Sequence, residues 1–149
     1  MKMLHDEKAA AARMASGVIT SGGFLGRDAR ALADIIAADE ERFAALGLDF
    51  QAVADTLEKL AKEGAAGLGE PITVGALLVK SDEARGQFPC PYDDGLFHKN
   101  SVTVERVGMG ERISYSDLSI HLLRVHHFCQ GEGSPFRLDP DALKRILAL

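Results

Sequence analysis

Apolar residues recur at helical spacing through the first 64 residues of the chain. Residues 8–14 are good helix formers, and Ser21-Gly22-Gly23 then interrupts the pattern. From Arg27, apolar positions fit one face of a helix: Leu32, Ile35, Ile36, Phe43 and Leu46. This pattern predicts a helix with Asp28 as its cap and Gly47 at its end. We expect its acidic residues, Asp34, Asp39, Glu40 and Glu41, to lie mainly on the solvated side.

A second amphipathic pattern follows directly. Apolar residues step at i, i+3, i+4, i+7, i+10 and i+11 through Phe50, Val53, Ala54, Leu57, Leu60 and Ala61. Asp49 is a suitable N-cap, and Gly64 is a natural terminator. The short joint at residues 47–48 predicts a helical hairpin.

Beyond residue 64 the spacing of apolar residues changes. Three punctuating residues, Gly67, Gly69 and Pro71, precede an apolar run over residues 72–79 that predicts a strand. Residues 101–107 and 111–116 alternate between apolar and polar, with a glycine-rich connection at 108–110. These two runs predict a β-hairpin.

Two more helices complete the predicted fold. The segment from Leu118 to about Cys129 has apolar residues nearly all round, which is typical of a buried helix, and Ser116 or Asp117 caps it. Pro140 at the first position, with Asp139 as cap, predicts a final helix through Leu149. We expect one α+β domain over residues 1–149, with a helical subregion (1–64), a mixed subregion (65–149) and about three antiparallel strands. The edges of such a sheet can pair with another chain, so both a homodimer and a monomer are compatible with the sequence.

Composition narrows the classes of function. The chain has 149 residues, 46% of them hydrophobic, with a net charge of −5. An acidic chain without a run of Lys and Arg lacks the charge of a nucleic-acid binder. We find neither a secretory signal nor a stretch that would span a bilayer, and Cys90 and Cys129 are too few for a disulfide scaffold. We therefore expect a cytoplasmic protein with no nucleic-acid or membrane partner.

Reactive side chains gather in two segments. In residues 88–100, two prolines flank Cys90, and Asp93, Asp94 and His98 follow. Prolines restrict the backbone on both sides of the cysteine, so we expect a rigid loop suited to a binding site. The alternative is a tight connection whose Tyr and Phe fill the core.

The second segment, residues 116–129, contains His121, His126, His127 and Cys129. With Leu118 three residues before His121 and four residues between His121 and His126, it resembles the helical half of a two-Cys, two-His zinc finger. The resemblance covers about a dozen residues. No Cys-x₂₋₄-Cys pair precedes it, so the DNA-binding activity of that family is not carried over.

A zinc site built from both segments is one hypothesis. Cys90, His98, His121 and His126 are suitable ligands, although on a regular helix the two histidines point about 140° apart. A second set, Cys90, His98, His126 and Cys129, is equally reasonable, since His126 and Cys129 lie on neighbouring sides of the helix. The alternative is that His121 is a core histidine and that His126 and His127 lie at a frayed helix end, where the dipole favours histidine.

Two functional hypotheses follow. The first is a non-catalytic binding or interaction domain, whose partner is another protein or a second copy of the chain. The second is a zinc-binding protein, in which the metal is structural or serves hydrolysis with Asp93, Asp94 or Asp117 as base. A metal-free enzyme with Cys90 as nucleophile and His98 or His121 as base lacks a supporting motif. Residues 131–134 lack the spacing of a phosphate-binding loop and are expected to form a turn.

Overall fold

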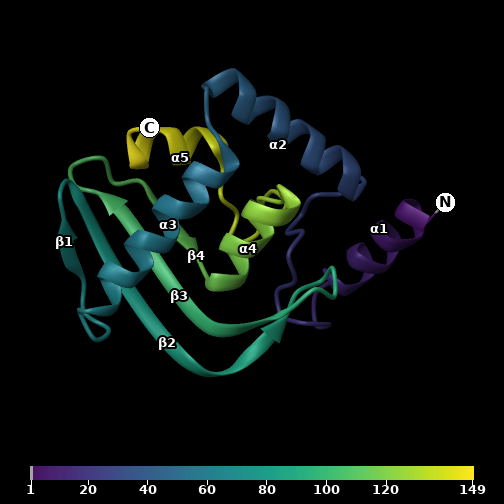
Figure 1. The fold of residues 1–149 in the computed structure, drawn as a ribbon, viewed down its shortest axis with the longest axis horizontal. Helices are drawn as coiled ribbons and strands as arrows, with labels where there is room; N and C mark the ends of the chain where they lie inside the picture. Colours follow the sequence, from purple (N-terminus) through teal and green to yellow (C-terminus); the bar gives the residue numbers. More distant parts are fainter. Residues whose placement is uncertain (1) are drawn as a thin grey trace.

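The computed structural model describes residues 2–149, with side chains described from residue 7 onward. Its elements follow one another as α1 (Lys2–Arg13), α2 (Leu32–Leu46), α3 (Phe50–Ala65), β1 (Ile72–Val74), β2 (Leu77–Pro89), β3 (Leu96–Arg106), β4 (Arg112–Tyr115), α4 (Asp117–His126) and α5 (Pro140–Leu147) (Figure 1). The predicted class, a single α+β domain, is confirmed.

The sheet is antiparallel, with the strand order β1-β2-β3-β4. It has four strands where the sequence predicted about three, because the run 72–79 folds back on itself. Gly75 adopts a φ of 59° between β1 and β2, a conformation that glycine reaches without strain. The predicted hairpin of β3 and β4 is confirmed, with Val104 opposite Ile113. The outer strands β1 and β4 are short, and homodimerisation through a sheet edge stays a prediction.

The predicted loop 88–100 is largely strand. β2 continues to Pro89 and β3 starts at Leu96, so these two long strands extend far beyond β1 and β4 (Figure 1). The pairing resumes after an irregularity, with Gln87 opposite His98 and Pro89 opposite Leu96. Only residues 90–95 form the connecting loop. The prolines did not prevent pairing because Pro89 is the last residue of its strand.

Local capping explains most helix limits. Asp49 accepts a hydrogen bond from Ala52 N at the start of α3, and Gly47 ends α2 in the left-handed conformation, both as predicted. The prediction for the start of α2 is wrong. Its N-cap is Ala31, and Asp28 instead accepts hydrogen bonds from Arg30. Asp139 caps α5, with Pro140 at its first position, as predicted.

One buried residue contradicts the predicted solvated face of α2. Asp39 is 5% exposed and receives two hydrogen bonds from Arg137, each of 3.0 Å. It follows Ile35 by four residues, and this spacing places both side chains on the same helix face. The charge is buried because Arg137 pairs with it.

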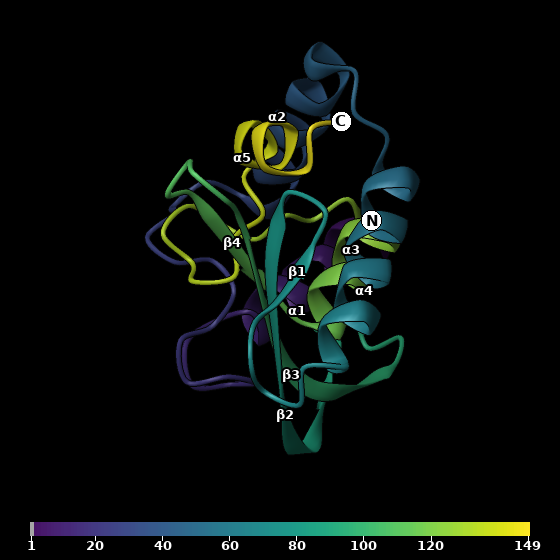
Figure 2. The same cartoon turned by 90° about the vertical axis from the view of Figure 1, so that its left-hand side faces the viewer.

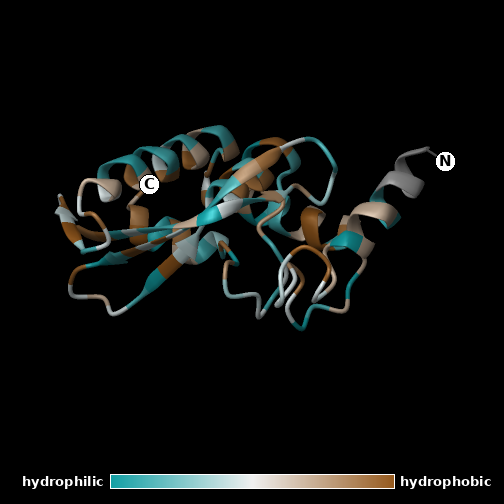
Figure 3. Ribbon diagram, turned by 90° about the horizontal axis from the view of Figure 1, so that it is seen from below, coloured by the Kyte–Doolittle hydropathy of each residue, from teal (hydrophilic) through white to brown (hydrophobic). Residues whose placement is uncertain are grey.

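Helices α3 and α4 cover one face of the sheet, while loops from the N-terminal third and the segment before α5 lie on the other side (Figure 2). The apolar stripe of α3 is buried and its outward side is hydrophilic (Figure 3). Tyr115 of β4 is fully buried and donates a hydrogen bond to Leu57 O, which ties the sheet to α3. As predicted, α4 buries apolar residues on opposite sides, Leu122 and Leu123 among them. None of the described helices combines the length and apolarity that crossing a membrane requires.

Candidate metal centre

The loop between β2 and β3 is folded into a compact turn. Cys90 N donates to Gly95 O, and Asp93 N donates to Cys90 O. Asp93 adopts a φ of 61°, a left-handed conformation that Asp tolerates better than most residues. The backbone N–H of Tyr92 lies 3.4 Å from the sulfur of Cys90. An N–H that donates to sulfur stabilises a thiolate, and such bonds accompany thiolate ligands of metals.

Helix α4 brings two histidines over this turn. Ser116 and Ser119 form a capping box at its start, and His127 ends it in the left-handed conformation. The ring of His127 stacks on Phe50, and its Nδ1 lies 2.8 Å from Glu40. His126 is therefore the last helical residue, and it lies beside the loop rather than at a frayed end.

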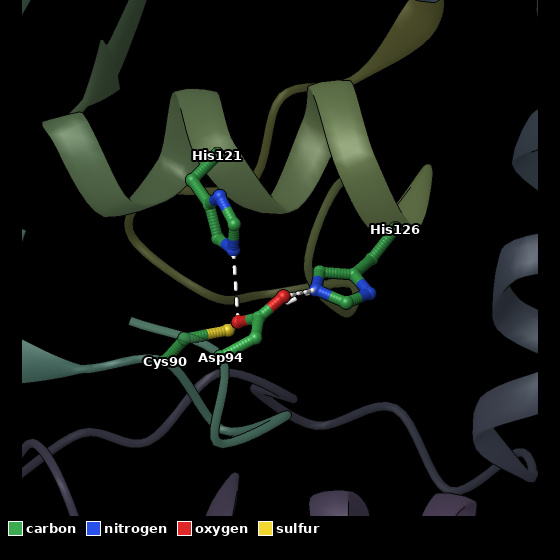
Figure 4. Close-up of side chains that lie close together, drawn as sticks. All are labelled: Cys90, Asp94, His121 and His126. Atoms are coloured by element: carbon green, nitrogen blue, oxygen red, sulfur yellow. Dashed lines mark hydrogen bonds and ion pairs between the residues drawn. The ribbon is translucent and has the colours of Figure 1, made fainter. Parts of the chain in front are cut away.

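Four side chains from these elements converge (Figure 4). The carboxylate of Asp94 lies between the two rings, with Oδ1 at 2.9 Å from His121 Nε2 and Oδ2 at 2.7 Å from His126 Nε2. The sulfur of Cys90 lies 4.0 Å from His126 Nε2. One ligand atom from each of Cys90, Asp94, His121 and His126 lies within 4.8 Å of all the others.

Aromatic residues hold the two imidazoles in place. Tyr92 stacks on His126 with 3.8 Å between ring centroids, and Phe97 lies against His121 at 4.4 Å. The two histidine side chains are only 16% and 17% exposed, whereas that of Asp94 is 35% exposed. The ligand atoms therefore have a largely fixed geometry, which lowers the entropic cost of binding an ion.

The charges of the group suit a cation. Burial, together with the nearby Asp94 carboxylate, raises the pKa of the Cys90 thiol to about 12. Burial raises the pKa of Asp94, but hydrogen bonds from Cys90, His121 and His126 outweigh this and lower it to about 2. Burial lowers the pKa of His126, although Asp94 opposes the shift. The group thus holds a carboxylate, a neutral imidazole and a protonated thiol that a metal ion would convert to thiolate.

The structure brings together three of the five residues that the sequence suggested as ligands. Cys90, His121 and His126 meet, while His98 and Cys129 lie elsewhere. His98 is on β3, where its Nε2 lies 3.9 Å from Glu83 and its side chain is 46% exposed. Cys129 is 1% exposed and belongs to the large apolar core between α3, the sheet and α5. The second predicted ligand set is therefore not assembled.

His121 and His126 lie in one group although they are five residues apart on α4, a spacing that separates side chains by about 140° on a regular helix. Their rings are 5.3 Å apart. Both reach one group because Asp94 approaches between them and offers a separate oxygen to each. In the sequence, Asp94 was a candidate base and not a predicted ligand. The feature that could have identified Asp94 as a ligand is its position four residues after Cys90, within the same turn.

Comparisons with family models, with curated proteins and with solved structures gave no match to this chain.

Proposed function

We propose that this protein is a zinc-binding, non-catalytic domain in which one Zn²⁺ ion is held by Cys90, Asp94, His121 and His126. The observation that carries the proposal is the convergence of four ligand atoms within 4.8 Å. One thiolate, two imidazoles and one carboxylate are ligands that zinc takes in tetrahedral sites. Apart from the turn 90–95, no local interaction requires these groups to meet, since 27 and 32 residues separate Asp94 from the histidines.

A structural role for the ion is favoured by the number of ligands. Four protein ligands complete a tetrahedral shell, as in structural zinc sites. Cys90 is 1% exposed, and of the four proposed ligands only His121 lines one of the two cavities described, the one between α3 and α4. The ion would join the far end of the β2–β3 hairpin to the C-terminal end of α4. Its binding free energy then contributes to folding.

Hydrolysis is a second candidate, and the exposure of Asp94 supports it. At 35% exposed, Asp94 is the most accessible of the four ligands. If water replaced it, Cys90, His121 and His126 would remain as three protein ligands with an open fourth position, the pattern of catalytic zinc. Asp94 would then serve as the base. Zinc-dependent ester hydrolysis that Asp94→Asn abolishes without loss of zinc would favour this role over the structural one.

The test is elemental analysis of untagged protein purified without chelator. We expect about one zinc per chain, which is the stoichiometry of a single four-ligand site. His121→Ala should lower the zinc content, while His98→Ala, a histidine outside the group, should leave it unchanged. Cobalt loading gives an independent readout, since a tetrahedral Co²⁺–thiolate centre absorbs strongly in the visible and near ultraviolet. Metal-free protein that binds neither Zn²⁺ nor Co²⁺ would overturn the proposal.

A further inference from the structure

A cavity of about 460 Å³ lies away from the zinc ligands. It is open to solvent and is bordered by the loop of residues 20–24, the segment of residues 130–136 and the strands β2 and β3. None of Cys90, Asp94, His121 and His126 lines it. Its size is within the range of small-molecule sites.

The floor of this cavity is the sheet face opposite α3. Ser81 points toward α3, where its hydroxyl donates to Ala61 O. Successive residues of a strand face opposite sides, so Asp82 and its partner Ser101 point away from α3 and into the cavity. Apolar walls are supplied by Phe24, Phe88, Leu118, Pro135 and Phe136.

One polar side chain in the wall has a donor that no described residue uses. Gln130 is 4% exposed and lines the cavity. Its Oε1 accepts a hydrogen bond of 2.6 Å from Ser134, and its backbone carbonyl accepts one from Arg137. Among the side chains described, residues 7–149, none accepts a hydrogen bond from Gln130 Nε2. Nε2 is not sealed from solvent, because among the described residues the buried side-chain atoms without a partner are Glu63 Oε2 and Arg124 Nε. This N–H is therefore free to donate to a water or a ligand in the cavity.

The charges at the rim leave one cation free. Asp82 is paired with Lys80 at 3.5 Å, and Glu83 lies 3.9 Å from His98. Lys99 makes no ion pair within residues 7–149. Its ammonium lies 4.5 Å above the Phe88 ring, at the edge of the cavity. A ligand in this cavity therefore meets apolar walls, an amide donor and the Lys99 ammonium, with the exposed carboxylates of Asp82 and Glu83 elsewhere in the lining.

We propose that this cavity binds a small carboxylate that carries a flat apolar body. The body fills the space between Phe24, Phe88 and Phe136, and the carboxylate oxygens accept from Gln130 Nε2 and Lys99 Nζ. The aromatic walls match the flat apolar body, and the two donors match the carboxylate. The proposal is independent of the zinc site, because the two share no lining residue.

The probes are naphthalene-2-carboxylate and its cationic counterpart, 2-naphthylmethylammonium, titrated into the ¹⁵N-labelled full chain. The side-chain amide resonance of Gln130 reports directly on the proposed contact. Gly22→Phe blocks the site, because Gly22 lines the cavity, a Cβ there meets no atom within 4 Å, and its φ is not positive. Ala38→Phe adds the same side chain to an exposed position of α2 and is the control.

For the charge, Lys99→Gln is compared with Lys59→Gln, an exposed lysine on α3. We expect saturable shifts of Gln130 and residues 20–24 with the carboxylate only, loss of those shifts in Gly22→Phe, and affinity lowered about tenfold by Lys99→Gln, the size of one charge-assisted hydrogen bond. The two control variants should bind as the parent does. Absence of a Gln130 shift, equal binding of the ammonium compound, or unchanged binding in Gly22→Phe would overturn the proposal.

Discussion

His126 Nε2 lies 4.0 Å from the sulfur of Cys90, although 36 residues separate the two along the chain. The contact joins the turn between β2 and β3 to the last residue of α4. In this contact, the Cys90 thiol faces the half-buried imidazole of His126. Burial raises the pKa of that thiol to about 12. If Zn²⁺ binds as proposed, the same two atoms would become its ligands, and the thiol would release its proton.

The two cysteines should respond differently to substitution. Cys90→Ser removes a proposed ligand, so zinc content and unfolding temperature should fall together. Cys129→Ala removes a buried sulfur from the core and should cost about 1 kcal/mol, as core truncations often do, with zinc content unchanged. Elemental analysis and thermal unfolding of both variants check this. Equal zinc loss in both would contradict the ligand assignment.

Removal of the proposed Zn²⁺ ion should lower the free energy of unfolding of the parent protein. Free Zn²⁺ at about 100 times its dissociation constant stabilises a folded protein by about 2.7 kcal/mol, provided that the unfolded chain does not bind it. We therefore expect a chelator to lower the free energy of unfolding of the zinc-loaded protein, and added Zn²⁺ to restore it. Urea unfolding with and without Zn²⁺ measures the difference.

Asp94→Asn is the matched variant for this experiment, since the amide keeps the shape of the carboxylate but lacks its charge. Asp93→Asn, at the neighbouring exposed position, is the control. Zn²⁺ should stabilise the control as it does the parent, and should stabilise Asp94→Asn much less. Equal stabilisation of all three proteins would show that the ion binds elsewhere.

The candidate site could be predicted only in part from the sequence. Residue types singled out Cys90, His121 and His126, because Cys and His are the common zinc ligands. His98 is closer in sequence to Cys90 than either of the other histidines, yet strand pairing with Gln87 places it on β3, away from the loop. Which ligands meet depends on where β2 ends and how α4 lies over the turn, and these are tertiary relationships.

More of the fold than of the candidate site could be predicted from the sequence. The periodicity of α3 and the caps Asp49 and Asp139 follow from local chemistry, and the structure confirms them. The length of β2 was missed because residues 82–87 are all exposed and contain no large apolar side chain, so no alternation marks them as a strand. Backbone pairing with β3 at Asp82, Glu83 and Gln87 keeps this segment in the sheet, although its side chains are not buried. The burial of Asp39 was missed because its partner, Arg137, is 98 residues away.

This buried ion pair gives a third prediction. Asp39→Ala would leave Arg137, whose side chain is 13% exposed, without its main partner. Removal of one member of a buried pair costs about 3–5 kcal/mol, and we expect the lower end because Arg137 also donates to Gln130 O. Arg42→Ala, which breaks the exposed pair with Asp141, should cost much less. Urea unfolding of the two variants compares the pairs, and equal losses would contradict the structural assignment.

Acid should weaken the contact between the loops of residues 25–28 and 131–133. Asp28 accepts hydrogen bonds from Arg30 and from Glu132 N, and the Arg30 guanidinium is the main cause that holds the pKa of Asp28 well below its usual range. A carboxyl with a lowered pKa in the folded state contributes stability above its unfolded pKa of about 3.9, and this stability is lost as the pH falls toward the folded value. The free energy of unfolding, measured in chelator so that zinc does not contribute, should therefore fall with pH below about 4.

Asp28→Asn should make that fall shallower, since the amide still accepts from Glu132 N but has no proton to take up. The exposed Asp34→Asn on α2 is the control and should retain the slope of the parent. A slope unchanged by Asp28→Asn would show that this carboxyl does not link proton uptake to unfolding. Because Arg27 N also donates to Glu132 O, the two loops should stay joined at neutral pH in both variants.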